Sequence, residues 1–185
     1  MKPSSALLRT PFTAGLLTAA LCAPAAALPE LVVLVRHAER AAEPAGNPAL
    51  TPAGEQRAQA LAQALGGLRV NAILTTQFRR TQDTAAPLAR ALGIQPQAVE
   101  ARRGGAAEHV RAVADAVRAQ TGVVLVVGHS NTVTAVLAEL GGPKLAEICE
   151  TSFHHAFLLQ PGTPAPRWAQ FSYGAPSVAP EAGCL

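Results

Sequence analysis

The stretch LVVLVRHAER (residues 31–40) decides the fold that we expect for this chain. It opens with five apolar residues, three of them valine, and a short unbroken run of this kind predicts a strand buried on both faces. Arg36 and His37 follow the run directly. Open α/β folds bind ligands at the carboxyl ends of their strands, so both side chains are expected at a binding edge of a sheet.

A second apolar run, VVLVV (residues 123–127), leads into Gly128 and His129. It also predicts a buried strand that ends at a histidine. Because the chain carries this arrangement twice, the pattern indicates a site shared by His37 and His129 and not a coincidence.

Helical periodicity and turn residues predict further elements around these two strands. Thr51 followed by Pro52 is typical of a helix start, with threonine as the N-cap and proline at the first helical position. The other expected elements are a strand at 72–74, a helix at 79–92, a weak strand at 97–101, a helix around 110–117, a helix at 131–140, and strands at 153–159 and 168–171. Their alternation predicts a three-layer α/β/α sandwich with a mostly parallel central sheet.

Residues 1–27 have the pattern of a secretory signal peptide. Lys2 and Arg9 precede an apolar run over residues 12–21, and the alanines at 25–27 offer a cleavage site. The run is too short for a spanning helix, and no later stretch is long enough to cross a membrane. We therefore expect a periplasmic or secreted domain over residues 28–185, with an irregular tail from about residue 174.

The charge balance excludes one class of partner. Without Lys2 and Arg9, the 15 Lys and Arg residues fall to 13 against 12 Asp and Glu, and the formal net charge falls from +3 to +1. With no basic tract in the chain, no nucleic-acid partner is expected.

Two cysteines, Cys149 and Cys184, remain after loss of Cys22 with the signal peptide. An oxidising compartment favours a disulfide between them. The alternative is a buried Cys149 that packs as a small apolar residue beside a loose tail. Neither cysteine has the spacing of a metal ligand.

The chemistry of the residues at the strand ends suits a phosphoryl group. Guanidinium groups such as Arg36 and Arg80 form forked hydrogen bonds with phosphoryl oxygens and balance their charge. A neutral His37 would act as the nucleophile and form a phosphohistidine. His129 is expected to stay largely protonated and to bind a transferring oxygen. A zinc site built on His37 and His129 is disfavoured, because the flanking arginines would repel the metal.

The chain also resembles the histidine phosphatases, the phosphoglycerate mutase-like superfamily. Four ordered segments carry the resemblance: LVRHAE (34–39), LTPAG (50–54), TQFRRTQDTA (76–85) and GHS (128–130). Ala38 stands where the family more often has glycine, and Thr76 where it has serine. The resemblance implies a phosphoglycerate mutase-like fold, with an antiparallel strand added to the sheet.

The same resemblance implies roles for individual residues. His37 would be the nucleophile, and Arg36, Arg80 and His129 the phosphate pocket. Independently of the resemblance, no metal or cofactor is expected, because the arginines supply the positive charge. Arg79 is the rival of Arg80, but the spacing to Thr84 favours Arg80. Thr51 and Asn47 are candidates to line the pocket, although an N-cap role is the simpler one for Thr51.

The general acid stays open. Ser130 stands where many family members have aspartate, so that position supplies none. Glu100 and Glu108 are candidates by region, and Glu39 by its proximity to His37. Each of them has a surface or ion-pairing role as the simpler interpretation.

Three other histidines have structural interpretations. We expect His109 on a helix surface. His154 and His155 begin a strand, where adjacent side chains point to opposite faces, so they are not expected to act as a pair.

These features favour an exported phosphatase that hydrolyses a phosphomonoester, or a related small phosphorylated compound, through a phosphohistidine. Two alternatives are a phosphoglycerate mutase-type phosphotransferase and a catalytically silent phosphate- or phosphosugar-binding module. The loops at 41–48 and 101–108 would determine the substrate, and their sequences indicate neither the substrate nor an oligomeric state.

Overall fold

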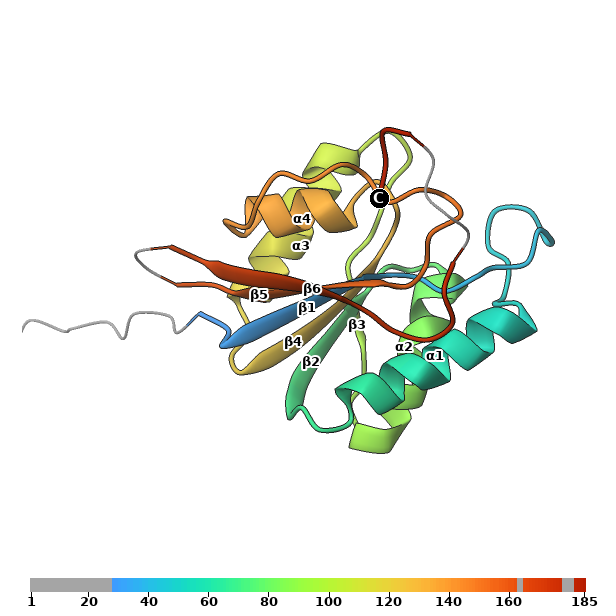
Figure 1. Cartoon of the computed structure of the whole chain (residues 1–185), viewed down its shortest axis with the longest axis horizontal. Coiled ribbons are helices and arrows are strands. Elements are labelled where there is room, and N and C mark those ends of the chain that lie inside the picture. Colours follow the sequence, from blue (N-terminus) through green and yellow to red (C-terminus); the bar gives the residue numbers. More distant parts are fainter. Residues whose placement is uncertain (1–27, 163–164, 178–181) are drawn as a thin grey trace, which may run out of the picture.

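The computed structural model describes residues 28–162, 165–177 and 182–185 (Figure 1). The proposed signal peptide, residues 1–27, lies outside the described residues. The elements in chain order are β1 (Leu31–Arg36), α1 (Pro52–Leu65), β2 (Val70–Thr75), α2 (Arg79–Leu92), β3 (Gln97–Ala98), α3 (Ala106–Arg118), β4 (Val123–Gly128), α4 (Val133–Glu139), β5 (His155–Gln160) and β6 (Arg167–Ser172).

One mixed sheet forms the centre of the structure. Its strand order is β3-β2-β4-β1-β5-β6. The first four strands in this order pair in parallel, and β5 pairs antiparallel with both β1 and β6. The mostly parallel sheet expected from the sequence is confirmed, and β1 lies inside it between β4 and β5.

Two apolar layers pack the helices onto the sheet. On one face, Val113 of α3 and Leu137 of α4 pack with Val32 and Leu34 of β1. On the other, Leu61 of α1 and Leu88 of α2 pack with the alternate β1 residues, 33 and 35. Figure 1 shows α3 and α4 on one side of the sheet and α1 and α2 on the other. The three-layer α/β/α sandwich is confirmed.

The start of α1 is fixed by a cap and by one close approach. Thr51 is the N-cap, and its hydroxyl accepts a hydrogen bond from the Gly54 N–H at 3.1 Å. The Thr51 N–H donates to the Glu39 carbonyl at 2.9 Å, which ties the helix to the chain just after β1. A Cβ atom at Gly54 would collide with that same Glu39 carbonyl oxygen, so glycine is required there.

Some expected bounds differ from the structure. The helix expected at 79–92 forms with those bounds, whereas the strand expected at 97–101 ends at Ala98. The strand expected from 153 begins only at His155. His154 therefore precedes β5, and the two imidazole centroids lie 4.1 Å apart. The prediction that these side chains point to opposite faces is wrong, because the alternation of a strand does not extend to His154.

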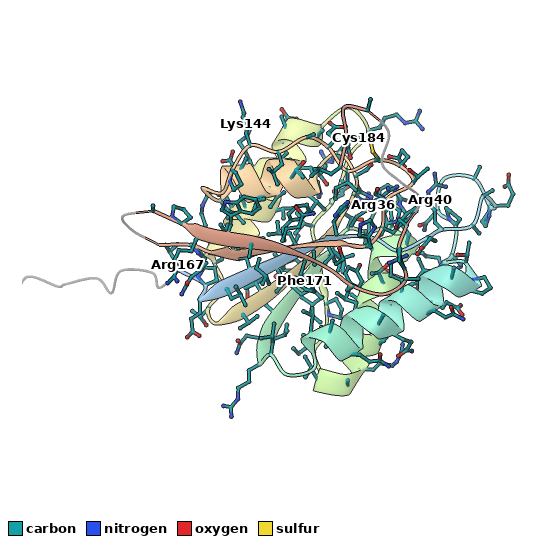
Figure 2. The ribbon with its side chains drawn as sticks, in the orientation of Figure 1. Arg36, Arg40, Lys144, Arg167, Phe171 and Cys184 are labelled. Carbon is teal, nitrogen blue, oxygen red and sulfur yellow. A yellow bond between two sulfur atoms is a disulfide. The ribbon has the colours of Figure 1, made fainter. Side chains whose placement is uncertain are left out.

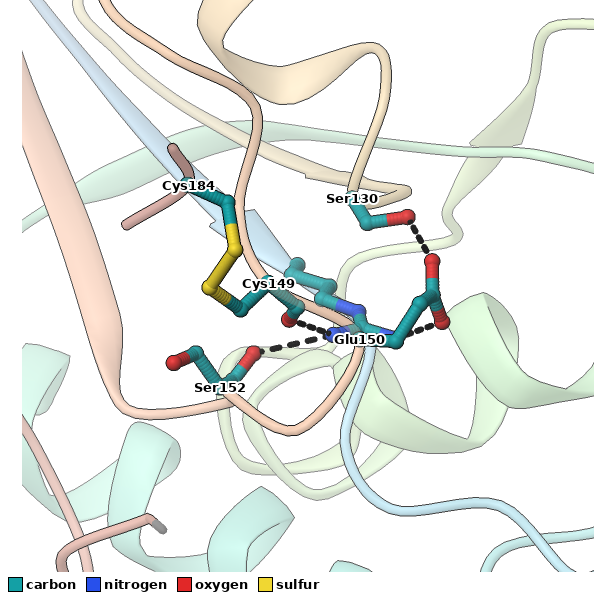
Figure 3. Close-up of a disulfide and its surroundings, with 6 residues drawn as sticks. Ser130, Cys149, Glu150, Ser152 and Cys184 are labelled. Atoms are coloured by element: carbon teal, nitrogen blue, oxygen red, sulfur yellow. Dashed lines mark hydrogen bonds and ion pairs between the residues drawn. A yellow bond between two sulfur atoms is a disulfide. The ribbon is translucent and has the colours of Figure 1, made fainter. Parts of the chain in front are cut away.

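The structure has the disulfide between Cys149 and Cys184, with Cα atoms 5.1 Å apart (Figure 3). Backbone hydrogen bonds hold the same place: the Cys149 N–H donates to the Leu185 carbonyl, and the Leu185 N–H donates to Glu147. Residues 174–177 and 182–185 form no helix or strand. The end of the described chain is thus fastened to the loop between α4 and β5.

Within the described residues, no helix combines the length and the apolar character that a membrane crossing requires.

Replacing Gly54 with alanine is expected to destabilise the protein. The added Cβ forces α1 away from Glu39, and overpacking of this kind costs roughly 1–3 kcal/mol. Urea denaturation measures the free energy of unfolding. Gly67→Ala is the matched control, because a Cβ at Gly67 meets no atom within 4 Å, and a change within about 0.5 kcal/mol is expected. Equal stabilities of the two variants would contradict the close-approach argument.

Candidate active site

The pairing of β1 with β4 places His37 beside His129. Arg36 lies opposite Gly128 in the parallel register, and the His37 N–H donates to the Gly128 carbonyl at 3.0 Å. The two imidazole centroids are 5.5 Å apart, with an interplanar angle of 66°. The two histidines predicted to share a site do so.

His37 is held as one tautomer. Its Nδ1 lies 2.8 Å from the Ala38 carbonyl oxygen, which can only accept, so Nδ1 carries the proton. The lone pair is therefore on Nε2. Burial, aided by the charges of Arg36 and Arg80, lowers the pKa of His37 to about 3. A neutral imidazole with a free Nε2 lone pair is the form that a nucleophile needs.

His129 is neutral as well. Its Nδ1 lies 3.4 Å from an Arg80 Nη2, which can only donate, and its Nε2 lies 3.2 Å from the Thr76 hydroxyl. Burial, followed by the charge of Arg80, lowers the pKa of His129 to about 3. The prediction that His129 stays protonated is therefore wrong for this arrangement.

The start of α2 directs Arg80 and not Arg79 toward the histidines. Arg80 lines the cavity, its Cζ lies 4.3 Å from the centroid of the Phe78 ring, and its Nε is buried without a hydrogen-bond partner among the described residues. Arg79 is exposed and pairs with Asp83 at 3.6 Å.

A threonine on α2 ties that helix to the end of β1. The Thr84 hydroxyl accepts from the Ala38 N–H at 2.9 Å and donates to the Arg80 carbonyl at 2.6 Å. The spacing of the 76–85 segment thus places Arg80 and the backbone beside His37 in one hydrogen-bonded unit.

Arg36 is 2% exposed and lies behind the cavity, not on its wall. The Nη1 of Arg36 donates to the carbonyls of Cys149 (2.6 Å) and Ser152 (3.0 Å). Its Nη2 donates to the Glu150 carboxylate at 2.6 Å. Its Nε is buried without a partner among the described residues. In Figure 2, Arg36 and Arg40 lie at the carboxyl end of β1, and Arg167 lies at the opposite end of the sheet.

The histidines open into a cavity of about 410 Å³. Besides His37, His129 and Arg80, the cavity is lined by four charged residues, Arg40, Arg102, Arg103 and Glu150. A larger cavity of about 590 Å³ runs along α2 and β3, but it is lined by no histidine and by neither Arg36 nor Arg80. The chemistry therefore belongs to the smaller cavity.

Two residues expected to line this cavity lie elsewhere. Thr51 caps α1, and the Asn47 side chain accepts from the Arg79 N–H at 2.8 Å. Neither is among the cavity-lining residues. Asn47 instead holds the loop after β1 against the start of α2.

None of the three candidate acids lines the cavity either. The Glu39 carboxylate accepts from Arg57 at 2.7–3.0 Å. Glu100 pairs with Arg102 and Glu108 with Arg111, both on exposed surface. All three carboxylates are engaged in ion pairs, and none of them lines the cavity.

Glu150 and His109 are lining residues whose place in the cavity was not predicted from the sequence. Glu150 lies in the irregular loop before β5, where no periodicity marks a functional residue. His109 was predicted on a helix surface, and this is wrong: it is 5% exposed, and its Nδ1 donates to the Glu100 carbonyl at 3.1 Å. Its spacing of four residues from Val113 and eight from Val117 places it on the inner stripe of α3, a signal that the sequence did contain.

Among the described residues, no group of three or more His, Cys, Asp or Glu side chains is placed to hold a metal ion.

Comparison with known proteins shows which family the first half of the domain resembles. A sequence model of the histidine phosphatase superfamily (branch 1) matches residues 32–104, the part that contains Arg36, His37 and Arg80. The match shows that this part of the chain is similar to the histidine phosphatase superfamily. No curated protein matches the chain.

Solved structures share the fold. The protein histidine phosphatase SixA complexed with tungstate has a TM-score of 0.60 at 19% identity, covering 77% of this chain and 96% of its own. A putative phosphohistidine phosphatase SixA from Agrobacterium tumefaciens has a TM-score of 0.58 at 23% identity, covering 80% and 100%. The mycobacterial glucosyl-3-phosphoglycerate phosphatase Rv2419c has a TM-score of 0.55 at 19% identity, covering 80% and 99%. At these identities the likeness concerns the fold, which is phosphoglycerate mutase-like.

The lowered pKa of His37 has a measurable consequence. A histidine with the ordinary pKa of about 6.5 gains a proton as the pH falls from about 8 to about 5, whereas His37 is expected to stay neutral over this range. Ring ¹⁵N shifts in long-range ¹H–¹⁵N spectra report both the charge and the Nδ1–H tautomer. In the urea-unfolded chain, all five histidines should titrate near the ordinary value. A midpoint near 6.5 for His37 in the folded protein would contradict the assignment.

Proposed function

We propose that this protein is an exported, metal-independent phosphatase that hydrolyses a small phosphorylated compound through a phosphohistidine at His37. The observation that carries the proposal is a neutral His37 with its lone pair on Nε2, close to two arginines whose buried Nε–H groups have no partner among the described residues. A buried donor without an acceptor is costly, and a phosphoryl oxygen is a matching acceptor.

The first half of the reaction forms a bond between His37 Nε2 and phosphorus. The hydrogen bond from Nδ1–H to the Ala38 carbonyl keeps the ring oriented and stabilises the positive charge that develops on it. The bond from phosphorus to the leaving oxygen breaks, and water later cleaves the phosphohistidine to release phosphate.

Fixed positive charge supports this transfer. Phosphoryl transfer depends mainly on positioning and on stabilising charge over the equatorial oxygens. Arg80 and Arg40 supply charge from the cavity wall, and Arg36 from behind it. These guanidinium groups are in the charged form without any proton exchange with the substrate.

The substrate belongs to the phosphomonoesters or related phosphorylated compounds. Relatives in fold carry the names protein histidine phosphatase and glucosyl-3-phosphoglycerate phosphatase, so the same fold serves phosphatases named for different phosphorylated compounds. A cavity of about 410 Å³ with exposed Arg102 and Arg103 at its rim favours a small anionic molecule.

Export rests on two features. The sequence of residues 1–27 has the order of a signal peptide: basic residues, an apolar run and small residues. The disulfide between Cys149 and Cys184 is of a kind that persists in oxidising compartments such as the periplasm.

Replacing the nucleophile tests the proposal. His37→Ala is expected to abolish hydrolysis of p-nitrophenyl phosphate and to remove any acid-labile phosphoenzyme, because it removes the Nε2 atom that bonds to phosphorus. Steady-state assays and acid-quench labelling with a ³²P-phosphodonor measure both effects. His154→Ala is the control, since His154 lies outside the cavity, and it should behave like wild type. Near wild-type hydrolysis by His37→Ala would overturn the mechanism.

Chelation tests the source of positive charge. EDTA is expected to leave the hydrolysis rate unchanged, because Arg36, Arg40 and Arg80 provide the charge that the transition state requires. Vanadate, an analogue of phosphate, should inhibit competitively. Loss of activity on chelation with recovery on adding zinc would favour a metallohydrolase instead.

A further inference from the structure

The second half of the proposed reaction needs a proton acceptor. The water that attacks the phosphohistidine must lose a proton, while His37 is bonded to phosphorus. Arginine side chains cannot accept it, and both ring nitrogens of His129 already face other groups, Thr76 and Arg80. His109 also lines the cavity, but burial lowers its pKa and makes protonation of its ring unfavourable. Among the described residues that line the cavity, Glu150 is the only carboxylate.

Glu150 is held at both carboxylate oxygens and still contacts water. Its Oε2 accepts from Arg36 Nη2 at 2.6 Å, and its Oε1 accepts from the Ser130 hydroxyl at 2.5 Å (Figure 3). Ser130 directly follows His129, so this bond places the carboxylate next to the second histidine. The Glu150 side chain is nevertheless 75% exposed, so a proton that it accepts can leave to solvent.

The backbone around Glu150 is fixed on both sides. The Ile148 N–H donates to the Ser130 carbonyl at 3.1 Å, and Cys149 is bonded to Cys184. The carbonyls of Cys149 and Ser152 both accept from Arg36. A group held in this way loses little freedom when it takes up a reacting geometry.

The charge state of Glu150 fits an acceptor. Partial burial acts to raise its pKa, but the hydrogen bond from Ser130 and the charge of Arg36 outweigh burial and lower the pKa. The carboxylate is therefore the ionised form at neutral pH.

We propose that Glu150 is a catalytic residue that accepts the proton of the hydrolytic water in the second half of the reaction. This inference rests on the proposed function and names its missing proton carrier. In hydrolysis, the water oxygen bonds to phosphorus, the P–Nε2 bond breaks, its electron pair returns to His37, and the water proton passes to Glu150. Glu150 then releases this proton to solvent and is again a carboxylate before the next first half begins.

Burst kinetics with p-nitrophenyl phosphate separate the two halves, because nitrophenolate leaves without a proton. Glu150→Gln keeps the size of the side chain and its capacity for hydrogen bonding but removes its basicity. A burst of about one nitrophenolate per molecule is expected, followed by a steady-state rate lowered by roughly 10²- to 10⁴-fold. The acid-labile phosphoenzyme should accumulate. Ser130→Ala, which removes one anchor and keeps the carboxylate, should show the same pattern with a smaller loss.

Glu108→Gln is the matched control, because Glu108 is an exposed carboxylate paired with Arg111 outside the cavity, and it should match wild type. Far-UV circular dichroism and thermal unfolding check that each variant is folded. Glu150→Asp retains a carboxylate and should therefore recover part of the steady-state rate.

Four outcomes overturn the inference. The first is wild-type turnover by Glu150→Gln. The second is a Glu150→Gln variant that does not fold, together with a Glu150→Asp variant that folds but is equally inactive. The third is an equal loss of rate in the first and second halves of the reaction, and the fourth is a loss of rate that weaker vanadate binding explains. The last two would leave Glu150 as a residue that only positions Arg36. Absence of a phosphoenzyme and of hydrolysis in the wild type would instead refute the proposed function itself.

Discussion

β1 and β4 run parallel with Arg36 opposite Gly128, and the rest of the site depends on this register. Because both strands are buried on both faces, a shift of one residue would turn apolar side chains out of their layers. The register therefore has a single favourable solution. In that solution, the backbone of His37 is bonded to Gly128, and the second imidazole lies beside the first.

The same burial that holds this register also sets the chemistry. A guanidinium behind the cavity is costly unless its donors are paired, and two loop carbonyls and the Glu150 carboxylate pair both Nη atoms of Arg36. Burial and the nearby cations make protonation of His37 and His129 unfavourable. An arrangement suited to binding a dianion is thus also one that keeps the nucleophile uncharged.

The sequence was sufficient for features that depend on local pattern. The apolar runs of β1 and β4 predicted the sheet, and the residues that end them predicted the paired histidines. The sequence was not sufficient for contacts between residues that are far apart along the chain. The Glu39 carboxylate pairs with Arg57, and Glu150 reaches the cavity from a loop that has no helical or strand periodicity. His109 is a different case. Its helical spacing from Val113 indicates a buried position, although we had expected His109 on the helix surface.

The contacts of Arg36 span a long stretch of chain, since its carbonyl partners lie 113 and 116 positions later. A chain is synthesised from its N-terminus, so β1 leaves the ribosome long before the segment that neutralises its arginine. Both histidines can be in place while this charge still lacks its partners. Contacts between segments so far apart in the sequence form slowly, so the charge of Arg36 is balanced only once residues 149–152 have docked against the end of β1.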